Sequence, residues 1–219
     1  NPGGNFELKD ESFFDKDYEK EFKKNKLIRH VILLKELNAT QLGKDIFKHL
    51  ADLNIEKGSE VLAAELATSV ERYDFAIQIS KKASYEKRFY NQFNYPIIAT
   101  PKIINNKVMP KAEVILAIIR QESEFAKSAN SWAGARGMMQ LMKYTAKIVA
   151  KQAKLPYSIS GLTRDPEYNI KLGSYYFNSL IEDYNGVYPF DIAAYNAGPN
   201  RVKTWRRVNG DPSKGLSLI

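Results

Sequence analysis

The sequence predicts an all-α protein made of two successive regions. Apolar residues recur at helical spacing along most of the 219 residues, whereas the alternation typical of strands is nearly absent. A segment rich in proline and asparagine, residues 94–110, interrupts the helical pattern. Proline disfavours helix at its own position and just before it. We therefore expect one domain in residues 1–94 and a second in residues 95–219.

The first region is predicted to be a series of short helices. Weak helix breakers at Asn38, Gly58 and Asn94 divide its apolar pattern. Short paired helices in series favour a superhelical, solenoid-like arrangement, although no fixed-period repeat is evident. The predicted helices span 27–38, 40–54, 59–69, 72–83 and 84–93.

The second region carries stronger helix-boundary signals. Pro110 precedes an apolar helical pattern, a position where proline is well tolerated. Asp165 followed by Pro166 is the pattern of an N-cap with proline in the first helical turn. Gly198 closes the next short helix. The predicted helices here are 111–125, 138–154, one that opens at Pro166, 189–197, and a final turn or two at 201–207.

Composition excludes several kinds of chemistry. The chain has no cysteine and two histidines, so disulfides, thiolate metal sites, cysteine nucleophiles and multi-histidine metal sites are excluded. Acid–base chemistry would therefore use carboxylates, tyrosine or lysine. The net charge of +8 points to anionic partners. No apolar run approaches the roughly 20 residues of a membrane-spanning helix. The chain begins at Asn1 without a signal-peptide core, and we interpret it as a mature product or a fragment.

Glu122 is the unusual carboxylate of the predicted helix 111–125. On a helical projection it falls between Ile118 and Ile119 in an apolar stripe, whereas Glu124 falls on the opposite face, where it can pair with Arg120. An acid on such a stripe is costly to ionise, and a raised pKa suits a general acid. Two structural alternatives remain open: a buried glutamate paired with a basic residue, or a stripe that opens onto solvent.

Four ordered motifs carry a resemblance to a known family. They are Gln-Glu-Ser at 121–123, Gly-Ala-Arg-Gly-Met-Met-Gln-Leu-Met at 134–142, Asp-Pro-Glu-Tyr-Asn-Ile-Lys-Leu-Gly at 165–173, and Ala-Ala-Tyr-Asn-Ala-Gly at 193–198. Together they resemble the catalytic domain of the soluble, Slt-type lytic transglycosylases, which cleave bacterial peptidoglycan. The resemblance covers residues 101–205 and implies a goose-type-lysozyme-like α-helical fold. The first region is similar in character to the superhelical linker domain of that family.

The resemblance also implies roles for individual residues. Glu122 corresponds to the single catalytic acid/base, and Tyr195 to the tyrosine that faces it. The implied substrate-binding residues are Ser131, Gly137, Met138, Met139, Gln140, Met142, Ala194 and Asn196. By themselves the methionines are more often core than groove. The sequence departs from the family at Lys143, where proline is frequent, and at Trp132, where a smaller residue or proline is usual.

The implied reaction is cleavage of the MurNAc–GlcNAc β-1,4 bond with formation of a 1,6-anhydromuramyl product. No second acid lies within the Gln-Glu-Ser, Gly-Ala-Arg-Gly and Ala-Ala-Tyr-Asn motifs, which fits a transglycosylase better than a two-carboxylate hydrolase. No metal or cofactor is expected. A hydrolytic goose-type lysozyme is the first alternative, and a non-catalytic helical-repeat scaffold is the second. Lysines interspersed with acids argue against a nucleic-acid partner.

The expected partner is the peptidoglycan glycan strand, whose stem peptides are rich in carboxylates. Peripheral association with a membrane or with other cell-wall enzymes is compatible with the chain, and no transmembrane segment is expected. The family resemblance implies a periplasmic location in the bacterial cell envelope.

Overall fold

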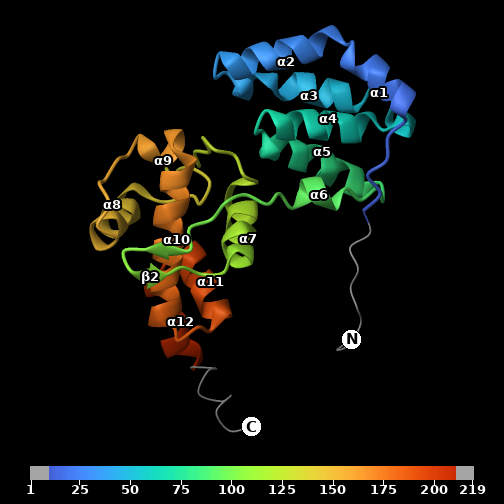
Figure 1. The fold of residues 1–219 in the computed structure, drawn as a ribbon. Helices are drawn as coiled ribbons and strands as arrows, with labels where there is room; N and C mark the ends of the chain where they lie inside the picture. Colours follow the sequence, from blue (N-terminus) through green and yellow to red (C-terminus); the bar gives the residue numbers. More distant parts are fainter. Residues whose placement is uncertain (1–9, 211–219) are drawn as a thin grey trace. The chain divides into compact units, whose positions relative to one another are not determined.

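The computed structural model describes residues 10–210 and confirms the all-α prediction (Figure 1). Contacts divide this part of the chain into two compact units. The first unit contains residues 10–98 together with Ile119–Ala126, and the second contains Ala99–Ile118 together with residues 127–210. The outer ends of both predicted domains, residues 1–9 and 211–219, lie outside the described residues. The division into a linker domain and a catalytic domain near residue 94 stays a prediction.

The first unit is a stack of short helices. Helices α3, α4 and α5 pack against one another in sequence order. Small buried side chains such as Ala63, Ala64 and Ala76 let their backbones approach closely, and the rings of Phe47 and Phe75 lie 5.2 Å apart in the core. The helices are α1 (Lys16–Lys23), α2 (Lys26–Glu36), α3 (Lys44–Ala51), α4 (Ser59–Ser69), α5 (Tyr73–Tyr85) and α6 (Asn91–Asn94), with short 3-10 turns at Thr40–Gly43 and Ile55–Lys57.

The prediction of a helix over residues 84–93 is wrong. Helix α5 ends at Tyr85, and Lys87 follows with φ +63°. Arg88 and Tyr90 then turn back toward α4, where the buried carboxylate of Glu60 accepts two hydrogen bonds from the guanidinium and one from the phenol, each of 3.0 Å. An ionised carboxylate is costly to bury unless it is paired in this way. This tertiary demand overrides the local helical pattern.

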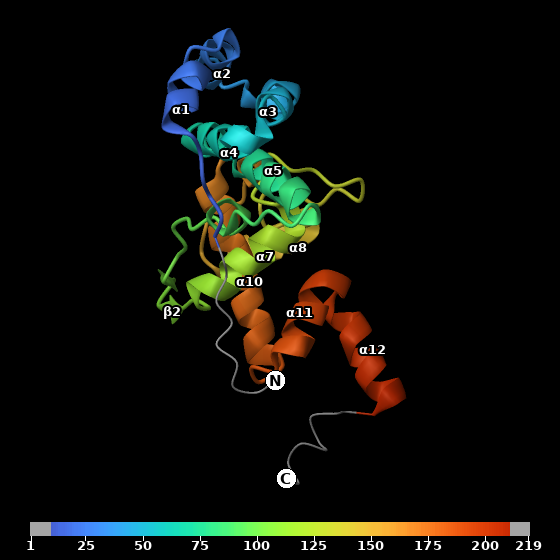
Figure 2. The same cartoon turned by 90° about the vertical axis from the view of Figure 1, so that its right-hand side faces the viewer.

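The second unit is organised around its longest helix, α10. The N-cap Asp165 accepts a hydrogen bond from the backbone N–H of Tyr168 at 3.0 Å, and Pro166 opens the helix, as predicted. Helices α8, α9 and α11 contact α10, and α12 packs on α11 (Figure 2). Within residues 10–210, no helix is both long and apolar enough to cross a membrane. The elements are β1 (Ile103–Ile104), β2 (Lys107–Val108), α7 (Ala112–Ser123), which the two units share, α8 (Lys143–Gln152), α9 (Gly161–Arg164), α10 (Pro166–Asp183), α11 (Tyr188–Ala197) and α12 (Pro199–Asn209).

A small hairpin lies inside the predicted breaker segment. Strands β1 and β2 pair in antiparallel fashion, with Ile103 opposite Val108. The two turn residues, Asn105 and Asn106, both have positive φ, at +47° and +61°. Two consecutive residues of positive φ are what a two-residue type I′ hairpin requires, and asparagine tolerates them better than most residues. The asparagines therefore mark a turn as well as a break between helices.

Candidate functional site

Glu122 lies near the C-terminal end of α7 and is half-buried. Burial raises the pKa of its carboxyl above the ordinary glutamate value, and no charged neighbour offsets this effect. The predicted direction of the pKa is thus confirmed. The side chain makes no ion pair with any residue in 10–210, which excludes the paired, purely structural glutamate.

Glu124 contrasts with Glu122, although only one residue separates them. Its carboxylate lies 3.2 Å from the Nζ of Lys81 and 3.4 Å from a guanidinium nitrogen of Arg120, so the predicted pairing with Arg120 is confirmed. Ion pairs this exposed contribute little to stability. Glu124 is therefore a matched control for any test of Glu122.

In the second unit, the loop before α8 folds into two tight turns. Ser131 accepts a hydrogen bond from the backbone N–H of Ala135 at 2.9 Å and so closes the first turn with its side chain. Arg136 and Leu141 exchange backbone hydrogen bonds of 3.0 and 3.1 Å around the second turn. Gln140 has φ +47°, and its side-chain amide donates to the carbonyl of Gly137 at 2.7 Å. The predicted helix 138–154 therefore begins only at Lys143.

The side chain of Asn169 on α10 holds the second turn in place. It is fully buried, accepts a hydrogen bond from the N–H of Met139 at 2.8 Å, and donates to the carbonyls of Arg136 at 2.9 Å and Leu162 at 3.0 Å. Gly137, at φ +72°, passes so close to this amide that a Cβ there would collide with it. One side chain thus satisfies three backbone groups, two from the loop before α8 and one from α9.

Tyr195 on α11 supports the same turn from the other side. Its hydroxyl donates a hydrogen bond of 2.6 Å to the carbonyl of Met139, and its ring packs against Tyr176 and Phe177 at centroid distances of 5.4 and 5.8 Å. Both backbone polar groups of Met139 are therefore engaged, one by Asn169 and one by Tyr195. The hydroxyl of Tyr195 has a positioning role that does not depend on a substrate.

The remaining predicted binding residues divide by exposure. Ser131, Met142 and Asn196 are exposed and Gln140 is half-buried, so their side chains are open to a ligand. The side chains of Met138, Met139 and Ala194 are buried, as is Gly137. Contacts from these four residues to a ligand would have to come from the backbone. The substrate-binding roles of all eight stay predictions.

The comparisons with known proteins are decisive for the family. The model of the family described as "Transglycosylase SLT domain" matches residues 102–217, more than half of the chain. The chain belongs to the Slt-type lytic transglycosylase family.

Curated relatives of this Slt-type chain include bacterial enzymes. The soluble lytic murein transglycosylase of Escherichia coli strain K12 is 43% identical over 91 residues, which is 41% of this chain and 14% of that protein. The putative soluble lytic murein transglycosylase of Haemophilus influenzae is 33% identical over 180 residues, which is 78% of this chain and 29% of that protein. The chain thus spans less than a third of either relative.

Solved structures of lytic transglycosylases share the fold. The 70-kDa soluble lytic transglycosylase of Escherichia coli superposes with a TM-score of 0.75 at 25% identity, over 94% of this chain and 33% of that one. Slt of Pseudomonas aeruginosa, crystallised as an inactive mutant in which a glutamate is replaced by glutamine, gives a TM-score of 0.71 at 26% identity, over 91% of this chain and 33% of that one.

Two polar residues of the Slt domain, Asn169 and Asp191, have structural roles that were not predicted from the sequence. Asn169 lies inside a quoted motif, but its three partners are distant in sequence. Asp191 precedes the Ala-Ala-Tyr-Asn motif by two residues. Its side chain is fully buried, neither oxygen has a hydrogen-bond partner in the described structure, and burial raises its pKa. The signal for Asp191 was its place one helical turn before Tyr195 on α11. Within residues 10–210, no group of three or more His, Asp or Glu side chains could hold a metal ion.

We expect Asp191→Asn to change how stability depends on pH. The folded protein holds the proton of Asp191 more tightly than the unfolded chain does. The stabilisation is therefore complete below the ordinary aspartate pKa of about 4 and is lost as the pH rises through the raised pKa. Asparagine cannot ionise, so the melting temperature of Asp191→Asn should gain on that of the wild type from about pH 4 to pH 8. If the melting temperatures of the two proteins changed in parallel across this pH range, the raised pKa of Asp191 would be contradicted.

Proposed function

We propose that the chain is a peptidoglycan lytic transglycosylase in which Glu122 is the only acid/base. The observation that carries this function is the family match over residues 102–217. This range contains all four motifs, including the Gln-Glu-Ser motif with Glu122. The raised pKa of Glu122 supports its role, because a general acid must remain protonated near the working pH.

The proposed reaction has two proton transfers through one carboxyl group. Protonated Glu122 donates its proton to the oxygen that links MurNAc to GlcNAc, and the C1–O bond of MurNAc breaks. The acetamido group of the same sugar supports the positive charge at C1. Glu122, now a carboxylate, removes the proton from the 6-hydroxyl, whose oxygen bonds to C1 and closes the 1,6-anhydro ring. The proton count of Glu122 is restored at the end.

The single-carboxylate scheme agrees with the surroundings of Asp191, the acid two residues before the Ala-Ala-Tyr-Asn motif. Asp191 is fully buried, so its carboxyl cannot reach a bound sugar to act as the second carboxylate of a hydrolase. The Pseudomonas aeruginosa Slt offers a parallel, since its glutamate-to-glutamine mutant is described as inactive. In this scheme Tyr195 acts as a positioning residue for the Met139 turn.

The substrate determines where the protein would work. Peptidoglycan lies in the bacterial cell envelope, and we propose the periplasm as the location and glycan strands as the partner.

The proposed function is tested by release of soluble muropeptides from purified sacculi. The whole chain should release them without added metal or cofactor, while the Glu122→Gln chain should bind the same sacculi and release almost none. A folded wild-type chain that binds sacculi and cleaves nothing would favour a non-catalytic scaffold instead.

A further inference from the structure

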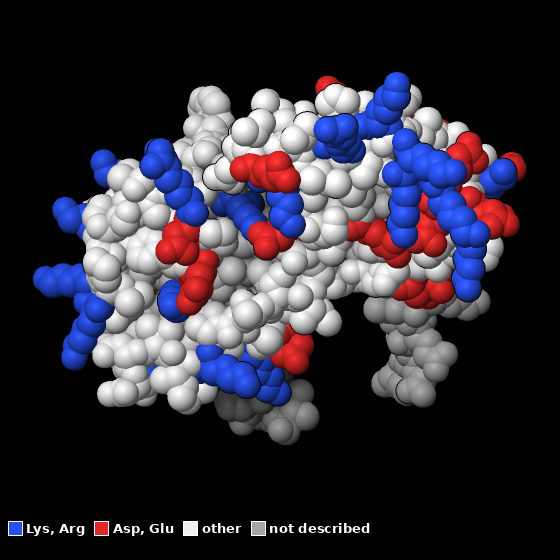
Figure 3. Space-filling view, turned by 45° about the horizontal axis from the view of Figure 1, so that its top comes forward, with Lys and Arg blue, Asp and Glu red and all other residues white. Residues whose placement is uncertain are grey.

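One stretch of the second unit carries almost all of the net charge. Residues 127–164 contain seven Lys and Arg and no Asp or Glu, against a net charge of +8 for the whole chain. The interspersed acids noted for other lysines are thus missing here. Figure 3 shows blue side chains projecting from the edge that carries α8, with no red between them.

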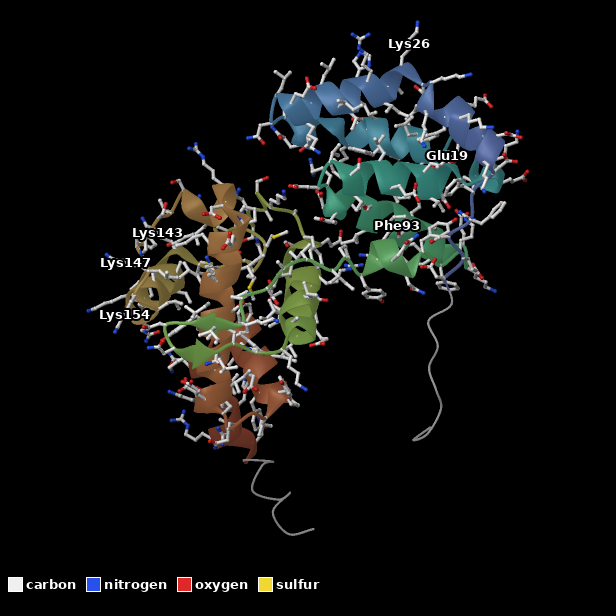
Figure 4. The ribbon with its side chains drawn as sticks, viewed as in Figure 1. Glu19, Lys26, Phe93, Lys143, Lys147 and Lys154 are labelled. Carbon is white, nitrogen blue, oxygen red and sulfur yellow. The ribbon has the colours of Figure 1, made fainter. Side chains whose placement is uncertain are left out.

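Helix α8 arranges three of these charges along one face, and a fourth follows its C-terminal end. Lys143, Lys147 and Lys151 lie at intervals of four residues, which places them in one line about 12 Å long, and Lys154 comes directly after the C-cap Ala153. All four are exposed, and the side chains of Lys143, Lys147 and Lys154 are seen to point outward in Figure 4. We call these four residues the lysine line.

The lysine line is not neutralised by the protein. None of its four members forms an ion pair with a residue in the described part of the chain, whereas Lys107 and Lys171 of the same unit pair with Glu182 at 2.8 Å and with Glu167 at 2.6 Å. An uncompensated row of like charges costs repulsion in the free protein. Such a row is therefore available to an anionic partner.

The lysine line begins at a hollow beside the loop that precedes α8, residues 131–142. This hollow of about 530 Å³ is lined by Gly134, Arg136 and Met142 of the loop and by Lys143, Tyr144 and Lys147 of α8. Tyr144 is largely exposed, at 76%, and so is Trp132, at 103%, which precedes the lining residue Ala133 in the sequence. Aromatic and cationic side chains thus surround a space large enough for a ligand fragment.

We propose that the lysine line is an accessory site that binds the carboxylates of peptidoglycan stem peptides. These stem peptides would belong to parts of the glycan strand that extend from the loop 131–142 along α8. This inference rests on the proposed function, and it adds which part of the substrate is recognised and where. Ammonium groups act as point charges that suit flexible carboxylates. A repeating polymer also suits a linear row, because weak contacts add along its length.

A lipid surface fits α8 less well than a carboxylate polymer does. An amphipathic helix binds a bilayer by burying its apolar face among the lipids. The apolar face of α8 is already committed to the protein core, where Ala146, Val149 and Ala150 are buried. On the exposed face, Tyr144 and Ile148 lie among three lysines and Gln152, so no continuous apolar surface is left for lipid.

The test compares two double variants in the Glu122→Gln background, where sacculi stay intact. Lys147→Gln with Lys151→Gln removes two members of the lysine line. Lys24→Gln with Lys26→Gln removes the same charge from exposed positions of the first unit (Figure 4). Binding is measured on native sacculi, on sacculi whose carboxylates have been converted to amides, and on vesicles of phosphatidylglycerol and phosphatidylcholine.

We expect the Lys147/Lys151 variant to bind native sacculi about fivefold more weakly than the Lys24/Lys26 variant at low salt, and the gap to close at high salt. On amidated sacculi the two variants should bind alike. Equal binding to native sacculi, a gap that survives amidation, or a gap seen only on vesicles would each overturn the assignment. Muropeptide release by the chain with both lysines intact tests the proposed function separately, because it does not depend on these variants.

Discussion

Glu122→Gln should reduce muropeptide release by a hundredfold to ten-thousandfold, the usual contribution of general acid–base catalysis. Glutamine keeps the shape and most hydrogen-bonding capacity of a protonated glutamate, but it has no proton to transfer. Burial keeps the wild-type carboxyl protonated to a higher pH than a free glutamate, so an uncharged amide suits the same surroundings. Stability should therefore change little, and initial rates together with melting temperatures check both expectations.

Glu124→Gln is the matched control for this loss. It makes the same chemical change two residues away and removes only ion pairs to Lys81 and Arg120. Its activity should stay near that of the wild type. If both variants lost activity alike, the effect would belong to the end of α7 in general. A well-folded and active Glu122→Gln chain would remove Glu122 from the chemistry.

Asn169→Ala should produce the largest loss of stability, about 3 kcal/mol or more. The truncation leaves the N–H of Met139 and the carbonyls of Arg136 and Leu162 without partners in a buried place. Each such group costs about 1–3 kcal/mol. In a domain of this size the melting temperature should fall by about 10 °C, and activity should fall with it because the Gly137–Gln140 turn loses its support.

Asn178→Ala on the same helix is the control for Asn169→Ala. Its side chain makes one exposed hydrogen bond, to Glu182 at 3.1 Å. Exposed contacts of this kind change stability by about 0.5 kcal/mol or less. Similar melting temperatures for the two variants would show that Asn169 does not hold the turn.

Features of the fold with local causes were predictable from the sequence, whereas features that depend on distant residues were not. The start of α10 was predictable because Asp165 and Pro166 act on their own helix. The raised pKa of Glu122 was predictable because an apolar stripe is readable from helical spacing. The late start of α8 was not, because the turn before it depends on Asn169, some 30 residues later. The end of α5 likewise depends on Glu60, which lies 28 residues before Arg88.

The same distinction applies to the candidate site. Motif resemblance named Tyr195 but could not reveal that its hydroxyl donates to the carbonyl of Met139. The close approach of α10 to Met139 at Gly173, where a Cβ would meet the methionine side chain, also follows only from packing. Residue type and order thus identify the chemistry, while the support of the loop depends on contacts between distant segments.

The central claim is that the 6-hydroxyl of the substrate, and not water, attacks the activated sugar. That hydroxyl is tethered beside the reacting carbon, so its effective concentration can far exceed that of a competing nucleophile. The most direct measurement is mass spectrometry of muropeptides released from sacculi in water enriched in heavy oxygen. We predict 1,6-anhydromuramyl ends, one water lighter than reducing ends and free of the label. Predominantly reducing ends that carry heavy oxygen would contradict the account and identify a lysozyme, with Glu122 as the acid and water as the acceptor.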